Sequence, residues 1–77
     1  MIIKNIKPLS NYILQITTED GKQANFDIKP YFDFEVFKTL KDFNEFNKIK
    51  NGKYYVEWEC GADLSADTIE AHMKISK

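Results

Sequence analysis

An Asp-Gly dipeptide, Asp20-Gly21, separates two stretches in which apolar and polar residues alternate. The stretches are residues 12–18 and 23–28, and alternation with a period of two is typical of strands that bury one face. Gly accepts the positive φ that a tight turn needs, so an Asp-Gly between two such stretches indicates a β-hairpin. The residues expected on its buried face are Tyr12, Leu14, Ile16, Ala24, Phe26 and Ile28.

Further strands are expected on both sides of this hairpin. Residues 2–9 are β-branched and apolar, and Pro8 ends them. Asn51-Gly52 is a second tight-turn signal, and the flanking residues 47–50 and 53–58 are predicted as strands four and five. The last of these strands is expected to place on one face Tyr54, Val56 and Trp58.

Two short helical regions are expected in the remaining segments. Pro30 ends the third strand, and apolar residues then recur every three positions up to residue 40, which places them on one face of a helix. Asp42 is in a position to cap a further turn, and Ser65, after a bend at Gly61, to cap a final helix. The apolar residues expected on these helices are Phe34, Phe37, Leu40, Phe43, Phe46, Ile69 and Met73.

The predicted order of elements is β-β-β-α-β-β-α. Seventy-seven residues make one domain, so we expect residues 1–77 to form a single domain without linkers or repeats. Tight hairpins join neighbouring strands, which makes the sheet mainly antiparallel. The prediction is therefore an α+β fold, a small two-layer domain with a sheet of about five strands and two short helices on one face.

Charge and cysteine content narrow the classes of function. The net charge is −1, which predicts neither attraction to nor repulsion from phosphate. All eleven basic residues are Lys, and the absence of Arg disfavours direct sequence-specific reading of DNA, although an AT-rich genome would also favour Lys codons. Cys60 is the single cysteine, which fits a reducing compartment. Because no signal peptide or membrane-length apolar run is evident, we expect a cytoplasmic protein without membrane contact.

Residue patterns for catalysis or metal binding are weak. Cys60 and His72 are the only possible nucleophile and base, and a lone Cys more often fills apolar space. Glu57 and Glu59 alternate along strand five, where a solvated strand face is the simpler interpretation than a pair of catalytic carboxylates. One His, one Cys and no CxxC or HxxxH spacing argue against a metal site. We therefore expect no cofactor and no enzymatic activity.

A basic turn is the main candidate for contact with nucleic acid. Lys48, Lys50 and Lys53 surround the Asn51-Gly52 turn, where they could touch phosphate, although a solvated hairpin tip is the simpler interpretation. Tyr54 and Tyr55 follow, and aromatic rings can stack on the bases of a single strand. Adjacent strand residues face opposite sides, so only one of the two rings can lie with the lysines. We take Tyr55, with the three lysines, as a candidate interaction surface.

The phenylalanines allow two interpretations. Phe34, Phe37, Phe43 and Phe46 have the spacing of a core face on short helices. If the helices cover only part of the sheet, some of these rings would instead form an exposed aromatic patch, and such patches mark interfaces with partners.

Short motifs in a fixed order run along almost the whole chain. They are Ile6-Lys7-Pro8-Leu9, Tyr12, Leu14, Asp20-Gly21, Phe26-Asp27-Ile28, Pro30, Phe37, Leu40, Phe43, Phe46, Trp58, Gly61-Ala62-Asp63-Leu64 and Asp67-Thr68-Ile69. In this pattern, from about residue 3 to residue 71, the chain resembles the bacterial family called domain of unknown function 2442. The family commonly has Pro and a small polar residue after the Trp. This chain has Glu59 and Cys60 there, so strand five is expected to run slightly longer.

The resemblance implies a fold like the N-terminal domain of a Nitrosomonas protein, and no established activity. In some relatives a helix-turn-helix domain follows, which we do not expect after Lys77. Many relatives are encoded beside a second small protein, which implies a paired, toxin–antitoxin-like system. Gly61 and Asp63 belong to the most distinctive segment of the family. They are either functional or the bend and cap that position the last helix, and we favour the structural interpretation.

Three functional hypotheses follow. The first is a non-enzymatic module that binds another protein or a second copy of itself, since an open sheet edge invites pairing. The second is a regulatory accessory protein that touches nucleic acid through the lysine turn. The third is a small enzyme that uses Cys60, His72 and Asp63, and it requires these side chains to converge.

Overall fold

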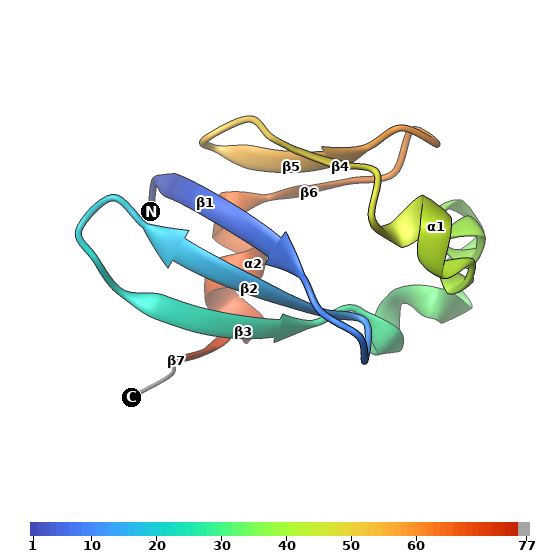
Figure 1. Cartoon of the computed structure of the whole chain (residues 1–77), viewed down its shortest axis with the longest axis horizontal. Coiled ribbons are helices and arrows are strands. Elements are labelled where there is room, and N and C mark those ends of the chain that lie inside the picture. Colours follow the sequence, from blue (N-terminus) through green and yellow to red (C-terminus); the bar gives the residue numbers. More distant parts are fainter. Residues whose placement is uncertain (76–77) are drawn as a thin grey trace.

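The computed structural model describes residues 1–75 (Figure 1). Its short strands form two small sheets, and its helices are also short. The strands are β1 (Ile3–Pro8), β2 (Ile13–Thr18), β3 (Gln23–Asp27), β4 (Ile49–Asn51), β5 (Tyr55–Trp58), β6 (Asp63–Ser65) and β7 (Lys74–Ile75). The helices are the 3-10 helices η1 (Lys29–Asp33) and η2 (Glu35–Lys41) and the α-helices α1 (Phe43–Phe46) and α2 (Ala66–His72). The predicted α+β class and the antiparallel pairing of neighbouring strands are confirmed.

The first sheet has the strand order β1-β2-β3-β7. β2 pairs with β3 in the register Leu14–Phe26, as the alternation of the two stretches predicts, and Gly21 takes a φ of 89° in the turn between them. The inward residues of β2 and β3 are buried and those between them are not, which confirms the predicted core face. β1 joins the other side of β2, with a bulge between Ile3 and Asn5.

The second sheet has the order β4-β5-β6. The predicted hairpin at Asn51-Gly52 is confirmed, but the positive φ, 71°, lies at Lys53. Gly52 makes room for the ring of Tyr55, because a Cβ there would lie 2.3 Å from Cζ of Tyr55 and the ring would have to shift. The ring of Tyr55 therefore lies directly over the turn. Tyr54 precedes β5 and is exposed, so its predicted place beside Val56 and Trp58 on the buried face is wrong.

The single sheet of about five strands is wrong, since the strands divide between two sheets of four and three. β6 and β7 were not expected from the sequence, because strands of three and two residues are too short to show an alternation. β6 is nonetheless a full partner of β5, in the register Val56–Leu64.

The helix expected over residues 31–40 is two 3-10 helices joined at Phe34, which is extended with a ψ of 134°. Pro30 opens η1, where its fixed φ and missing N–H cost nothing. The break moves the ring of Phe34 to the surface, while Phe37 and Leu40 are buried as predicted. Asp42 accepts from the N–H of Asn44 at 3.0 Å, which confirms the predicted cap of α1. Ser65 accepts from the N–H of Thr68 at 3.2 Å, which confirms the cap of α2.

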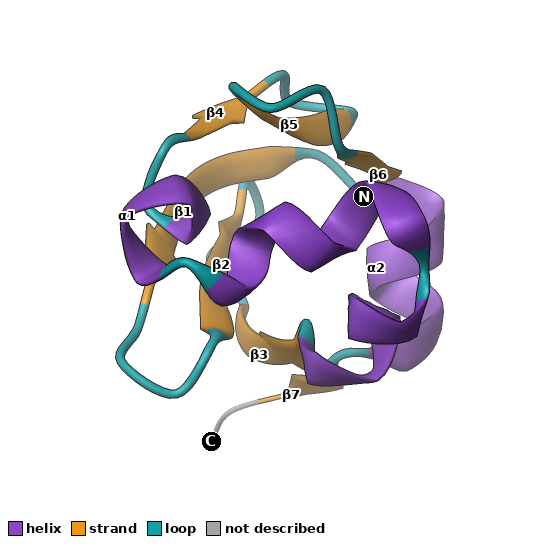
Figure 2. Cartoon of the chain, turned by 90° about the vertical axis from the view of Figure 1, so that its right-hand side faces the viewer, coloured by secondary structure: helices purple, strands orange, loops and turns teal. Residues whose placement is uncertain are grey.

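In Figure 2 the second sheet lies above β1, and α2 lies across the molecule from β2. The core lies between the two sheets and the helices and contains residues from all of them. Trp58 is at its centre, 1% exposed, and its Nε1 donates to the carbonyl oxygen of Phe46 at 2.9 Å. Phe46 stacks on the indole at a centroid distance of 6.4 Å, and Phe37 meets it edge-on at 6.2 Å. Most of the aromatic side chains are thus used in one connected cluster, and Phe46 and Phe37 are confirmed as core residues.

Candidate interaction surfaces

The three-stranded sheet turns one face to solvent, and cross-strand register fixes its charge pattern. Lys50 lies opposite Glu57, and Glu57 lies opposite Asp63, so the three side chains form a row across β4, β5 and β6. In the next row Tyr55 lies opposite Ser65. We call Lys50, Tyr55, Glu57, Asp63 and Ser65 the outer face of the second sheet. The structure thus brings together Lys50, Tyr55 and Asp63, three of the residues that the sequence proposed for interaction.

The lysines of the basic turn do not form a separate positive surface. Lys48 pairs with Glu45 at 2.8 Å, and this hydrogen-bonded ion pair raises the pKa of the Lys48 ammonium, with a further contribution from the charge of Glu59. Lys50 faces Glu57 across the strands. Lys53 lies in the turn itself, and its backbone N–H donates to the side chain of Asn51 at 2.8 Å. Two of the three lysines therefore have a carboxylate beside them, which weakens their attraction for phosphate.

The turn between β5 and β6 is built by Gly61. Its φ is 100°, and its N–H donates to the carbonyl oxygen of Trp58 at 2.9 Å, while Trp58 N–H donates to Ala62 at 2.8 Å. A non-Gly residue would be strained at this φ. This geometry gives Gly61 a structural role as the bend that returns the chain into β6, and it leaves Asp63 exposed on the outer face.

A second surface surrounds the joint between the 3-10 helices. A hollow of about 450 Å³ is lined by Asp27, Pro30, Tyr31, Phe34 and His72, and we call it the Phe34 hollow. Phe34 is 59% exposed, and Val36, two residues on, is 51% exposed. A further hollow of about 290 Å³ shares Asp27 and His72. The side chains of Phe34 and Val36 are therefore not buried in the core.

The Phe34 hollow is continuous with the core through a series of rings. Phe34 lies 6.1 Å from Tyr31, Tyr31 lies 5.5 Å from Phe37, and Phe37 meets Trp58. Tyr31 also contacts Phe26 of β3 at 5.6 Å. Such packing limits the movement of Tyr31, so one wall of the hollow is preformed. An exposed aromatic patch that includes Phe34 was one of the two interpretations of the sequence. The spacing of three residues, which is typical of a buried helical face, did not show that the chain breaks at Phe34.

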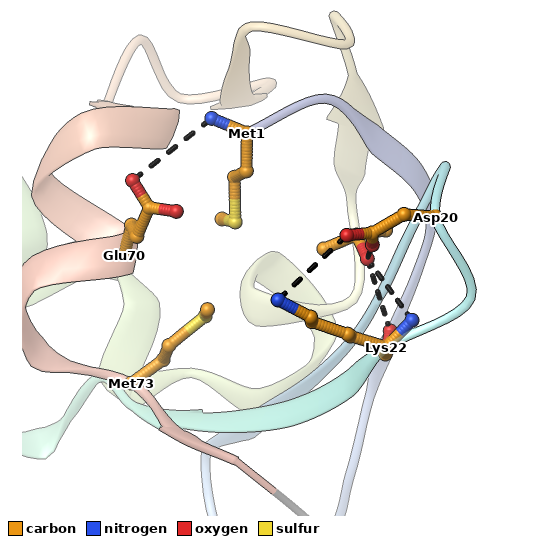
Figure 3. A pocket seen from close by; sticks show the side chains of 6 residues that line it. Met1, Asp20, Lys22, Glu70 and Met73 are labelled. Carbon is orange, nitrogen blue, oxygen red and sulfur yellow. Dashed lines mark hydrogen bonds and ion pairs between the residues drawn. The ribbon is translucent and has the colours of Figure 1, made fainter.

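Two other positively charged groups, the amine of Met1 and the ammonium of Lys22, already have a carboxylate partner within the chain. A hollow of about 230 Å³ lies between the β2–β3 turn and α2, with Met1 and Met73 facing into it (Figure 3). The amine of Met1 lies 4.0 Å from Glu70, and Lys22 lies 3.8 Å from Asp20 (Figure 3). Asp20 also accepts a hydrogen bond from the hydroxyl of Thr18, and this bond lowers the pKa of the Asp20 carboxyl.

The proposed catalytic residues do not converge. Cys60 is exposed in the β5–β6 turn, whereas His72 ends α2 and lines the Phe34 hollow. Figure 1 shows that turn and the β7 end of α2 well apart. Asp63 lies on β6 beside Glu57. Within residues 1–75 no group of three His, Cys, Asp or Glu side chains is arranged to hold a metal ion. None of the helices in that range has the length and apolar character to cross a membrane.

Comparison with known families settles the relationship. The family model described as "Protein of unknown function (DUF2442)" matches residues 3–74, which is nearly the entire chain. The chain belongs to the DUF2442 family. Within this DUF2442 protein the matched range includes the four helices and every strand of the described residues except the last residue of β7, so the family unit covers nearly the whole fold. No curated protein and no solved structure matches the chain.

Proposed function

We propose that this DUF2442 protein is a non-catalytic module that binds another protein through the Phe34 hollow and Val36. The observation that supports the proposal is the exposure of Phe34 and Val36 at one joint of the chain, 59% and 51% respectively. A chain of this size has a small core and gains most by burying such apolar side chains. Leaving them at the surface is explained when a partner covers them.

The geometry suits an apolar side chain of the partner. Tyr31 and Phe34 stand at a tilt of 41°, and Pro30 adds a rigid wall beside them. Burying one large apolar side chain contributes about 1.5–3 kcal/mol, so Phe34 and Val36 together could supply much of the energy of a specific contact. His72 also lines the hollow and offers a ring nitrogen for a polar contact, while Oδ1 of Asp27 already accepts from the N–H of Lys29 at 2.9 Å.

The partner we propose is a small protein encoded beside this one, the paired arrangement that the family resemblance suggests. The proposal also includes the absence of catalytic activity in the DUF2442 chain itself. Its role would then be to hold or to mask the partner, and the partner would carry any activity of the pair.

The experiment compares capture by three tagged forms of the chain from lysate of its own organism, followed by affinity measurement with the purified partner. Phe34→Ser is expected to weaken binding by about tenfold or more, as truncation of a central aromatic does at most interfaces. Tyr54→Ser is the matched control, because Tyr54 is 65% exposed and lies outside the hollow.

Equal weakening by both variants, or none by Phe34→Ser, would refute this surface. Circular dichroism of each variant shows whether the fold is retained. Val36→Ser supplies a second test, because Val36 is half exposed and its replacement removes little from the core.

A further inference from the structure

The edge of β6 has backbone groups that point away from its own sheet. Trp58 N–H donates to Ala62, and Ala66 N–H donates to Tyr54, both at 2.8 Å. Hydrogen-bonded and non-bonded pairs alternate along an antiparallel ladder. The backbone N–H and C=O groups of successive β6 residues therefore point alternately toward β5 and away from it. The N–H and C=O of Asp63 and the N–H of Ser65 therefore point to the outer edge. In this register the ladder with β5 does not use these three groups, and none of them takes part in the backbone hydrogen bonds that residues 1–75 form outside their helices and strands.

The edge strands of the first sheet, β1 and β7, differ from β6. β7 has only two residues and pairs with β3 at Ala24 and Asn25. β1 approaches the second sheet, where its Ile3 N–H donates to the carbonyl oxygen of Lys53 at 2.8 Å and Asn51 Nδ2 donates to the carbonyl oxygen of Ile3 at 2.9 Å. Pro8 removes a further donor from β1. β6 is at the end of its sheet, and within the described chain no strand pairs with its outer side.

The side chains beside this edge are acidic, and Asp63 lacks a basic neighbour. Asp63 and Glu57 are directly opposite at a position without ladder hydrogen bonds, where side chains come closest, and like charges there are destabilising. Glu57 has Lys50 on its far side, but Asp63 has only the open edge on its own. Among the described residues Asp63 forms no ion pair. A cation on an added strand would complete the row.

We propose that the edge of β6 binds an extended segment of a partner protein that carries Lys or Arg at alternate positions. The segment would bond to the backbone of Asp63 and Ser65 and place a basic side chain beside the Asp63 carboxylate. The next basic residue would lie beside Ser65 and the exposed ring of Tyr55, where an ammonium or guanidinium can also contact the ring face. This site is separate from the Phe34 hollow and does not depend on it.

A second copy of the chain suits this edge less well. Antiparallel pairing of two β6 strands about Leu64 would set Asp63 of each copy beside Ser65 of the other. That arrangement supplies no cation to either Asp63, so each row would keep its unfavourable pair of carboxylates. Charge complementarity therefore favours a basic segment as the occupant.

The probe is the peptide acetyl-Lys-Val-Lys-Val-Lys-Val-amide, titrated into the ¹⁵N-labelled full chain. The amide signals of Asp63 and Ser65 are expected to shift, and the same peptide with Glu in place of Lys is expected to bind much more weakly. Asp63→Asn is expected to weaken binding by about two- to fivefold, as loss of one opposite-charge cross-strand pair does. Asp33→Asn, an exposed acid on η1, is the matched control and should leave binding unchanged.

Backbone methylation of the peptide separates strand pairing from simple charge attraction. Methylating the Lys nitrogens, which face β6 in the proposed register, is expected to weaken binding on the order of tenfold or more, since it removes the donor to the carbonyl oxygen of Asp63. Methylating the Val nitrogens, which face away, should have little effect. Equal effects of the two methylations, or shifts confined to residues outside 61–67, would overturn the proposal. Phe34→Ser should not change peptide binding, so this result stands apart from the test of the Phe34 hollow.

Discussion

At the residue scale, Trp58 connects the two sheets to the helices. Its ring is buried between Phe37 and Phe46, and its Nε1 supplies the one hydrogen bond that ties β5 to the end of α1. The buried carbonyl oxygen of Phe46 would lose its partner if the indole were removed. The alternation in residues 53–58 placed Trp58 on the core face, but it could not show which backbone group the indole meets.

Replacing Trp58 with Phe should therefore lower the free energy of unfolding by about 2–4 kcal/mol, through the cavity and the unpaired carbonyl. Urea unfolding followed by circular dichroism measures the change. Tyr54→Phe, at an exposed site, is the control and should change stability by less than about 0.5 kcal/mol. A loss from Trp58→Phe as small as that of the control would mean that the indole is not the centre of the core.

At the element scale, the sequence predicted those elements that are long enough to show their own pattern. The β2–β3 hairpin follows from alternation and Gly21, and the caps of α1 and α2 follow from Asp42 and Ser65. β6 and β7 could not be found because strands of three and two residues are too short to show an alternation, and β7 in addition pairs with β3, which lies far away along the chain. The Phe34 joint was missed for a related reason, since both 3-10 helices keep a spacing that suits a single helix.

The two candidate surfaces also differ in how much of each could be predicted from the sequence. Tyr55, Asp63 and Lys50 could be named from the sequence, and their common face follows only from the register of β4, β5 and β6. The Phe34 hollow combines η1, β3 and the end of α2, which no local pattern brings together.

The β2–β3 turn provides a test by pH. The pKa of Asp20 is lowered in the folded chain by the Thr18 hydroxyl, so the ionised carboxylate stabilises the turn above the ordinary value of 3.8. This contribution is lost as the pH falls through the lower, folded pKa. Asp20→Asn should therefore be less stable than the natural chain near pH 6, and the difference should shrink as the pH falls below 3.8 and through the lower pKa of the folded chain.

Thermal unfolding between pH 6 and pH 2.5 measures this difference. Asp33→Asn is again the control, because it replaces an exposed acid with its amide on η1 and should show no such pH dependence. A stability difference for Asp20→Asn that grows as the pH falls would contradict the role of the ionised carboxylate.

At the scale of the whole molecule, one core is shared by two small sheets and leaves two unlike surfaces. The Phe34 hollow is apolar with a preformed aromatic wall, and the β6 edge is polar with free backbone groups. Surfaces of these two kinds suit different parts of a partner, a side chain inserted at one and an extended segment at the other. A single DUF2442 domain could thus hold one protein at two places.

The most direct test is hydrogen exchange of the full chain with and without its purified partner. Protection on binding is expected at the amides of residues 31–36, around the Phe34 hollow. Protection confined to residues 48–53, the lysine turn, with none at residues 31–36, would contradict the account.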